Sequence, residues 1–291
     1  MPQKVIIIGA RGMLGQDLAK TYREDKTSKI ITWDFEDLDI TDQKQVLTKI
    51  KKADPDVVIN AAAYNAVDKA EESEGFKIAI AVNAAGPENL AVACKKIGAV
   101  FVTYSSDYVF RGDQKEGYRE DDQPGPASKY GLSKFEGEKR VREIGGDYYI
   151  IRTSKLFGKI GTGKEVKKSF VDTMIELSDK LPELKVVDEE VSCFTYTPDL
   201  AKVTRFLLEG NFPPGIYHIT NSDPCTWYEC AKTIFEILEK KVRLIPVPAS
   251  EFPRPAKRPQ YSILLNTKLQ PIRSYKEALA EFLTQHKKRL R

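Results

Sequence analysis

The stretch Val5-Ile-Ile-Ile8-Gly9-Ala-Arg-Gly12-Met-Leu-Gly15 decides the fold of this chain of 291 residues. Its leading apolar residues close at a glycine, which is typical of a strand buried in a parallel sheet. Three glycines then open a helix. The first permits a tight turn, the second lets backbone approach a pyrophosphate, and the third packs helix against strand. The stretch therefore predicts a dinucleotide site at the start of an α/β domain.

Strand-like and helical segments continue to alternate along the first half of the chain. The expected strands lie at about 30–33, 57–59, 100–104 and 148–152, and the expected helices at about 12–22, 41–52, 83–96 and from 128 onward. Strands alternating with helices in this way predict a Rossmann-like, doubly wound parallel sheet.

Prolines punctuate the chain more densely beyond about residue 155, and the alternating pattern loosens. Helices are expected there at about 165–179, 198–209, 226–240 and 275–288. We therefore expect a dinucleotide-binding domain at 1–154, to which some later segments return. Residues 155–291 are expected to form mainly a smaller, mixed α/β substrate-binding lobe.

Bulk composition restricts the class of protein. An apolar content of 41% and a charged content of 30% are typical of a globular protein in water, and no run of about 18 apolar residues predicts a membrane helix. The N-terminus has no signal-peptide pattern, so we expect a cytoplasmic location. Basic clusters at 164–168 and 287–291 lack interleaved aromatic residues, which disfavours nucleic acid. The four cysteines show no C-x-x-C spacing, so neither zinc nor a disulfide framework is expected.

Acidic and small residues follow the next two strands at positions suited to a dinucleotide. Asp34 ends the second strand, where an acceptor for ribose hydroxyls belongs. A carboxylate there favours NADH because it repels a 2′-phosphate, but Arg11 offsets that repulsion, so NADPH stays open. Asp39-Ile40 is a candidate adenine contact, or Asp39 caps a loop. Ala61-Ala62-Ala63 suits a ring packed close to the strand end, or serves packing alone.

Tyr130-Gly-Leu-Ser-Lys134 places a phenol and an ammonium on one helix face, with Ser128 as a candidate N-cap. A nearby positive charge lowers a tyrosine pKa, and this predicts a usable proton donor. Ser106 ends the strand before this helix, at the sheet edge where ligands gather. Ser106 and Tyr130 are therefore expected to converge on one carbonyl oxygen, with hydride arriving from a reduced nicotinamide.

The Tyr-x-x-x-Lys spacing alone is weak, because it also occurs at Tyr22/Lys26 and Tyr228/Lys232. Only the middle copy follows both a Gly-rich turn and a Ser-Ser pair at the end of an apolar strand. We interpret the other two as ordinary pairs on helix faces.

The chain resembles the dTDP-4-dehydrorhamnose reductases, a family of the extended short-chain dehydrogenase/reductase superfamily, from about Lys4 to Leu283. The segments that carry the resemblance are Asn60–Glu71, Ser105–Phe110, Tyr118–Asp121, Tyr130–Lys134, Arg152–Ser154 and Pro255–Pro259. The resemblance implies reduction of the C4 ketone of dTDP-4-dehydro-β-L-rhamnose to dTDP-β-L-rhamnose with NADPH or NADH. It also implies a homodimer and, for some members, Mg²⁺.

Residue roles follow from the same resemblance. It implies that Ser106, Tyr130 and Lys134 are catalytic and that Ser106, Asp107, Lys155 and Arg258 face the substrate. It implies cofactor contacts at Gly12, Met13, Leu14, Asp34, Asp39, Ile40, Ala63, Tyr64 and Asn65. Gly9 and Gly15 of the glycine-rich turn, Ala61 and Ala62 at the strand end, and Tyr130 and Lys134 complete the predicted cofactor-binding set.

Three positions depart from the family pattern. Lys155 stands where these reductases usually place a tryptophan that contacts substrate, and Phe157 replaces a usual tyrosine. Phe194-Thr195 stands where Pro-Thr is usual. Losing an aromatic platform costs on the order of 1 kcal/mol of stacking, although Lys155 offers a charge that reaches a phosphate instead.

Two other interpretations stay open. The regulatory beta subunit of methionine adenosyltransferase shares the Ser-Ser-Asp-Tyr-Val-Phe stretch and also lacks the tryptophan, so a non-catalytic dinucleotide-binding subunit with a synthetase partner is an alternative. A sugar-nucleotide epimerase or dehydratase is the second alternative. Tyr108 supplies no second carboxylate after Asp107, which disfavours water elimination.

Overall fold

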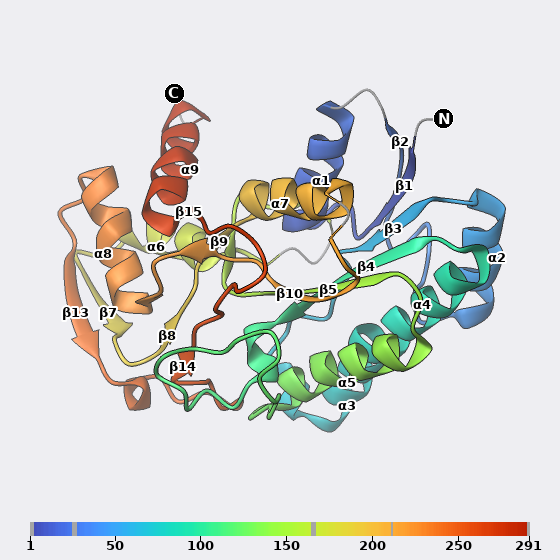
Figure 1. The fold of residues 1–291 in the computed structure, drawn as a ribbon. Coiled ribbons are helices and arrows are strands. Elements are labelled where there is room, and N and C mark those ends of the chain that lie inside the picture. Colours follow the sequence, from blue (N-terminus) through green and yellow to red (C-terminus); the bar gives the residue numbers. More distant parts are fainter. Residues whose placement is uncertain (1–2, 25–27, 164–166, 211, 290–291) are drawn as a thin grey trace.

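The computed structural model describes residues 3–24, 28–163, 167–210 and 212–289, without the side chains of 286–289. Its central sheet has six parallel strands in the order β10-β5-β4-β3-β1-β2 (Figure 1). The strands are β1 (Gln3–Ile8), β2 (Ser28–Trp33), β3 (Val57–Asn60), β4 (Val100–Ser106), β5 (Tyr148–Thr153) and β10 (Gly215–His218). The predicted Rossmann-like α/β class is confirmed.

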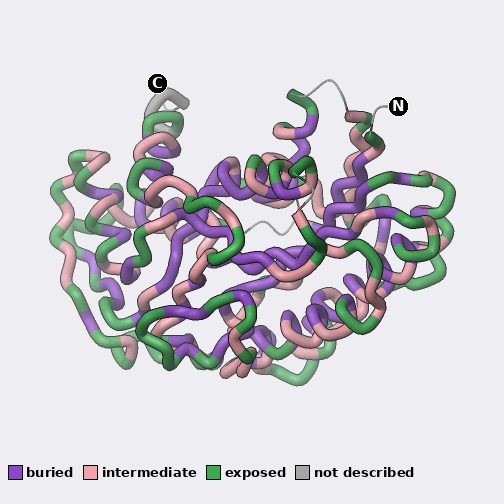
Figure 2. Tube along the Cα trace, in the orientation of Figure 1, coloured by how far each residue is buried: buried purple, intermediate pink, exposed green. Residues whose placement is uncertain are grey.

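Helices cover both faces of this sheet (Figure 1). On one face α1 (Met13–Glu24) packs against α7 (Thr197–Glu209). On the other face lie α2 (Gln43–Ala53), α4 (Gly86–Ile97) and α5 (Lys129–Ile144). The alternation along β1 explains the double cover, because successive side chains of a strand point to opposite faces. Val5 and Ile7 join the core under α1, whereas Ile6 and Ile8 join the core under α2 and α4. The strands β1, β3, β4 and β5 are accordingly buried through most of their length, whereas the edge strand β2 is only half-buried (Figure 2).

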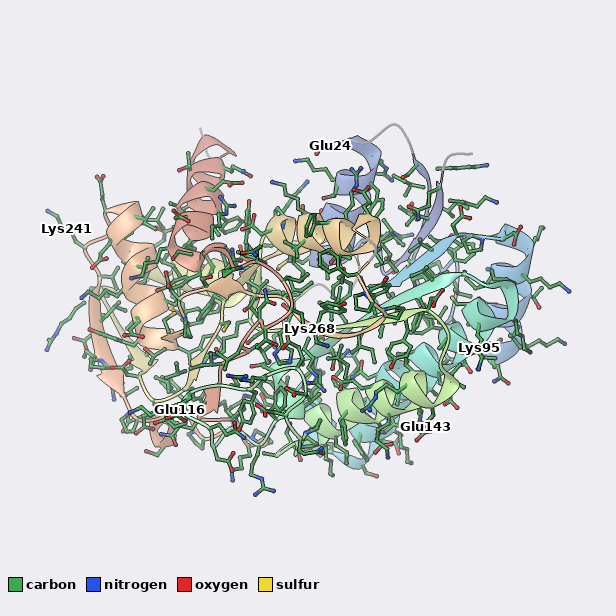
Figure 3. All side chains as sticks on the ribbon, in the orientation of Figure 1. Glu24, Lys95, Glu116, Glu143, Lys241 and Lys268 are labelled. Atoms are coloured by element: carbon green, nitrogen blue, oxygen red, sulfur yellow. The ribbon has the colours of Figure 1, made fainter. Side chains whose placement is uncertain are left out.

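A smaller lobe packs beside one end of the sheet (Figure 1). Its core collects aromatic and aliphatic side chains such as Phe157, Phe194, Ile234 and Leu279. Its helices are α6 (Phe170–Ser178), α8 (Trp227–Leu238) and α9 (Tyr275–Arg289). Its strands are β6 (Leu156–Phe157), β7 (Glu183–Val187), β8 (Val191–Ser192), β9 (Thr195–Tyr196), β11 (Asn221–Ser222), β12 (Cys225–Thr226), β13 (Arg243–Val247), β14 (Tyr261–Ser262) and β15 (Ile272–Ser274). The charged side chains labelled in Figure 3, such as Glu24 and Lys241, lie on the outside of the molecule.

The two halves of the sequence interleave. β10 pairs with β5 in the central sheet, and α7 packs on α1, although both come from the second half of the chain. The expected boundary near residue 154 follows directly after β5, and assigning it as a domain boundary stays a prediction.

Most predicted elements are present, with two corrections. The helix expected at 83–96 is α4, which begins at Gly86, and it is preceded by two elements that were not predicted, α3 (Ser73–Ile80) and a π-turn over Ala81–Ala85. The helix expected from 165 begins only at Phe170, because the Ser169 side chain accepts the backbone N–H of Asp172 and forms a capping box. Residues 165 and 166 of that expected helix lie outside the described residues.

A buried polar cluster joins β5 to β10 and α5. The Arg152 guanidinium donates to both oxygens of Glu138 at 2.9 and 2.7 Å, and both side chains are buried. His218 lies opposite Arg152 in the sheet register, and its Nδ1 donates to the Leu265 carbonyl at 3.0 Å. Burial, reinforced by the positive charge of Arg152, lowers the pKa of His218 to about 3.

This depressed pKa makes stability depend on pH. Below about pH 6.5 His218 is protonated in the unfolded chain, whereas in the folded chain it stays neutral down to about pH 3. Lowering the pH within this window therefore favours unfolding. We expect His218 to remove about 1.4 kcal/mol of unfolding free energy for each pH unit within that window. Urea unfolding at several pH values, compared between the wild type and His218→Gln, isolates this contribution. Identical pH dependence in the two proteins would contradict the assignment.

Candidate active site

The glycine-rich turn is fixed by backbone packing. Gly9 has φ +75°, and a Cβ there would lie 2.7 Å from the Ala62 nitrogen. A Cβ on Gly15 would lie 2.0 Å from the Gly9 carbonyl oxygen. The backbone N–H groups of Gly9 and Ala10 donate to the Trp33 carbonyl at 2.9 and 3.2 Å, which ties the turn to the end of β2. Side chains are therefore excluded where the backbone must approach a ligand.

The strand order reverses at this turn. β2 lies on one side of β1 and β3 on the other, which is the switch point where open α/β sheets bind ligands. A pocket of about 310 Å³ opens there. Six predicted cofactor residues line it: Gly9, Asp34, Asp39, Ile40, Ala62 and Ala63. Sequence reasoning missed the other lining residues, which are Ile8, Phe35, Leu38, Thr41, Ile78, Ala81 and Val82.

The remaining predicted cofactor residues do not line this pocket. Gly12 precedes α1 and Met13 begins it, so the turn feeds directly into a helix N-terminus. The Leu14 side chain is buried in the core, which leaves its backbone alone for a ligand. Tyr64 is held through its backbone by the Asn83 side chain at 2.9 and 3.0 Å. Ala61 donates its N–H to Ile8 at 2.9 Å.

The acidic residues of the pocket have defined local partners. Asp34 accepts the backbone N–H of Arg11 at 3.0 Å and that of Phe35 at 2.9 Å. The Arg11 guanidinium lies 3.3 Å from Glu36, so a second carboxylate offsets its charge. Asp39 accepts from the Thr41 N–H at 2.9 Å and hydroxyl at 2.7 Å, which is the loop-cap arrangement.

Tyr130 and Ser106 come together because α5 begins against the turn that follows β4. Ser128 is the N-cap of α5, as predicted, and accepts the N–H of Gly131 at 3.1 Å. A Cβ on Gly131 would lie 2.2 Å from the Tyr108 carbonyl oxygen, so only glycine allows this approach. The approach brings the Tyr130 phenol near the Ser106 hydroxyl, and the phenol donates to Asn65 Oδ1 at 3.3 Å.

The expectation that Lys134 lowers the pKa of Tyr130 is wrong for this structure. Burial raises the pKa of Tyr130, and the charge of Asp107 raises it further, whereas the nearby Ser106 hydroxyl opposes the shift. The Lys134 ammonium instead donates to the Tyr104 carbonyl of β4 at 2.7 Å. Burial also lowers the pKa of Lys134 itself to about 8. Desolvation therefore outweighs the cation that the four-residue spacing supplies.

Asp107 and Lys155 extend the site toward the lobe. The buried Asp107 carboxylate accepts from Ser106 and Ser154, each at 2.9 Å, and burial raises its pKa. The Lys155 ammonium lies 3.6 Å from the ring centroid of Trp227 in α8. Burial lowers the pKa of Lys155 to about 8, although the charges of Asp107 and neighbouring Glu190 oppose this shift. Lys155 has φ +41°, a strained conformation for a side-chain-bearing residue.

Arg258 borders the same region. Its guanidinium pairs with Asp68 at 2.7 Å and lies 6.0 Å from the ring centroid of Tyr108. The buried Nη1 has no hydrogen-bond partner within the described part of the chain. Ser106, Asp107, Lys155 and Arg258 thus surround the Tyr108 turn between sheet and lobe.

Two kinds of feature are absent from the described ranges. No group of three or more His, Cys, Asp and Glu side chains there could hold a metal ion. Nor does any described helix have both the length and the apolar character needed to span a bilayer.

A glycine-rich turn at a switch point, beside a buried tyrosine, serine and lysine, defines the class of nicotinamide-dependent oxidoreductases. Comparison with known sequences gives the particular family. The chain belongs to the family described as the RmlD substrate binding domain, which matches residues 3–288.

Individual relatives cover nearly the whole chain. A dTDP-4-dehydrorhamnose reductase of Streptomyces griseus is 38% identical over 287 residues, which cover 95% of this chain and 91% of the relative. A crystal structure of such a reductase from Clostridium acetobutylicum superposes with a TM-score of 0.91 at 40% identity, covering 98% of this chain and 100% of that one. Another, from Bacillus anthracis in complex with NADP, gives 0.90 at 38% identity, covering 98% and 100%.

Gly15→Ala tests the turn. A Cβ 2.0 Å from the Gly9 oxygen forces the turn to shift, so we expect a loss of about 1–3 kcal/mol of stability. Because the shifted backbone no longer meets the pyrophosphate, NADH affinity should fall about tenfold or more. Urea unfolding and a fluorescence titration with NADH measure the two effects. In Gly125→Ala, whose Cβ would meet nothing closer than 3.6 Å, both should stay near wild type; equal losses in the two variants would refute the assignment.

Proposed function

We infer that this chain reduces the C4 ketone of dTDP-4-dehydro-β-L-rhamnose to dTDP-β-L-rhamnose with NADH or NADPH. The observation that carries the proposal is the meeting of Tyr130 and Ser106 at the carboxyl end of β4, within the same sheet edge as the dinucleotide pocket. Membership of the family, with reductases matching over nearly the whole chain, supports the same reaction.

The residues divide the work as follows. Tyr130 donates the proton to the C4 oxygen, and burial keeps the phenol protonated at neutral pH until that oxygen becomes basic. Ser106 is a second hydrogen-bond donor for the same oxygen. Its hydroxyl donates to Asp107 in this structure, and rotation about the C–O bond turns the proton into the cleft. A bound reduced nicotinamide supplies the hydride.

Lys134 acts through position. Its ammonium is anchored to the Tyr104 carbonyl, one helical turn along α5 from Tyr130. This bond fixes the start of α5 against β4, so Lys134 orients the helix turn that carries the phenol. Its ribose contact is part of the proposal, as are the roles of the other cofactor residues.

The substrate contacts are proposed for Asp107, Lys155 and Arg258. The Lys155 ammonium lies against Trp227 and the Arg258 guanidinium lies beside Tyr108, and a pair of cations suits an anionic sugar nucleotide. Lys155 in place of a tryptophan exchanges stacking for charge, while Trp227 keeps an aromatic ring beside that position.

Cofactor preference and assembly are also part of the proposal. Asp34, with Glu36 offsetting the charge of Arg11, favours NADH, whereas a relative at 38% identity binds NADP. We propose a cytoplasmic homodimer by family resemblance and give Mg²⁺ no step. No observation on the site favours the regulatory-subunit alternative, and the buried Tyr108 turn offers no second carboxylate for a dehydratase.

Absorbance of the reduced nicotinamide, followed with the dTDP-4-keto sugar as substrate, tests the reaction. Tyr130→Phe removes the proton donor while keeping the ring, so we expect kcat to fall by about 100-fold or more with NADH affinity nearly intact. Tyr228→Phe changes the tyrosine of another Tyr-x-x-x-Lys pair, on α8, and should leave kcat unchanged. A fully active Tyr130→Phe variant would show that another group donates the proton.

Lys155→Met tests the substrate contact. Methionine keeps a flexible chain against Trp227 but removes the charge, so we expect KM for the sugar nucleotide to rise about tenfold with little change in KM for NADH. Lys185→Met, which removes an exposed lobe lysine paired with Glu251, is the matched control and should change neither constant. An unchanged sugar-nucleotide KM in Lys155→Met would assign the lysine to structure alone.

A further inference from the structure

Two exposed apolar side chains stand at the mouth of the dinucleotide pocket. Phe35 is 72% exposed, more than any other large hydrophobic side chain in the described ranges, and Ile78 is 49% exposed. Both line the 310 Å³ pocket, Phe35 from the loop after β2 and Ile78 from the last turn of α3. Large apolar groups exposed beside a cavity mark a binding surface more often than isolated exposure does.

The backbone that carries Phe35 is tightly held although its ring is not. The Phe35 N–H donates to Asp34 Oδ1 at 2.9 Å, and the Asp34 N–H donates to Asp37 Oδ2 at 2.9 Å. The N–H groups of Asp37 and Leu38 both return to the Asp34 carbonyl at 2.9 Å. The ring therefore projects from a fixed turn, so a ligand gains its contact without first ordering the loop.

A second part of the pocket lining comes from the end of α3 and the π-turn that follows it. Ile78, Ala81 and Val82 line the pocket where α3 passes into the π-turn, a feature that is frequent at functional sites. The floor contains Ile40, whose Cδ1 would lie 2.6 Å from a Cβ on Gly86. The glycine at the start of α4 thus makes room for the floor of the pocket.

The chemistry of this pocket fits a flat ring with apolar faces and polar edges. Most of its lining residues are apolar, and the polar side chains among them are Asp34, Asp39 and Thr41. Asp34 marks the ribose position, which places the adenine of a dinucleotide next to Phe35. We propose that Phe35, with Ile78, closes over the adenine ring and is a binding residue for the dinucleotide. Of the proposed function, this inference requires only that the chain binds a dinucleotide.

Fragments of the dinucleotide separate the adenine contact from the rest. Calorimetric titration of the full chain with ADP-ribose and with NADH should give Kd values about tenfold higher in Phe35→Ala, because base–aromatic stacking is lost. Nicotinamide mononucleotide, titrated in competition with NADH, should compete in Phe35→Ala with its wild-type Kd, because it has no adenine. Phe35→Trp should restore ADP-ribose binding. Unchanged ADP-ribose affinity in Phe35→Ala would overturn the proposal.

Phe206→Ala is the matched control. Phe206 is also exposed, at 55%, but lies in α7 against Phe212 and away from the pocket. We expect it to bind all three ligands as the wild type does. An equal loss of nucleotide affinity in both variants would overturn the proposal. A changed sedimentation coefficient of Phe35→Ala with unchanged nucleotide affinity would also overturn it, because the ring would then belong to an interface between copies of the chain.

Steady-state kinetics distinguish failure of the adenine contact from failure of the proposed reductase reaction. In Phe35→Ala, KM for NADH should rise about tenfold, while kcat and KM for the sugar nucleotide stay unchanged. A protein that binds ADP-ribose through Phe35 but turns over no sugar nucleotide would refute the reductase reaction and leave the adenine contact standing. If the wild type reduces the sugar nucleotide and Phe35→Ala has the same kinetic constants, the adenine contact is refuted and the reductase reaction stands.

Discussion

The close approach of two backbones at the switch point between β1 and β3 is the constraint on which the site depends. A side chain on Gly9 would meet Ala62, and one on Gly15 would meet Gly9 itself, so α1 starts directly against the strand end. Because β2 and β3 diverge from β1 there, the same approach leaves a pocket between the loops that follow them. The glycines thus fix both the helix N-terminus and the cavity beside it.

A second close approach brings the reacting groups to that sheet edge. Gly131 lets the first turn of α5 touch the Tyr108 carbonyl, and this seats Tyr130 beside Ser106 in a buried environment. Burial then decides the protonation state: it raises the pKa of the phenol and lowers that of Lys134. The site therefore holds a protonated tyrosine as its resting form. Its acidity toward a substrate oxygen depends on charges that arrive or develop in the cleft.

Local pattern made much of this structure predictable. The run Val5–Ile8, the Ser128 cap and the Tyr130–Lys134 spacing each act over a few residues, so sequence alone placed β1, α5 and the pair on it. The interaction between that pair and its surroundings is not local. Lys134 reaches the Tyr104 carbonyl only because α5 packs on β4, and no spacing reveals this. Phe35 could not be predicted from periodicity, because a single aromatic residue after a strand is equally compatible with an ordinary loop and with a binding residue.

The α3–π–α4 segment shows why a correctly placed helix still leaves a pocket wall unpredicted. The helix expected over 83–96 corresponds to α4, but it says nothing of Ile78, Ala81 and Val82, which come before it. In the structure the π-turn inserts between two helices, and its first two residues face the pocket. The Asn83 side chain at the same turn holds the backbone of Tyr64 and also donates to Ser133 of α5 at 3.0 Å. One irregular turn therefore connects a wall of the pocket to the helix that carries Tyr130, so the wall and Tyr130 are positioned by the same buried amide.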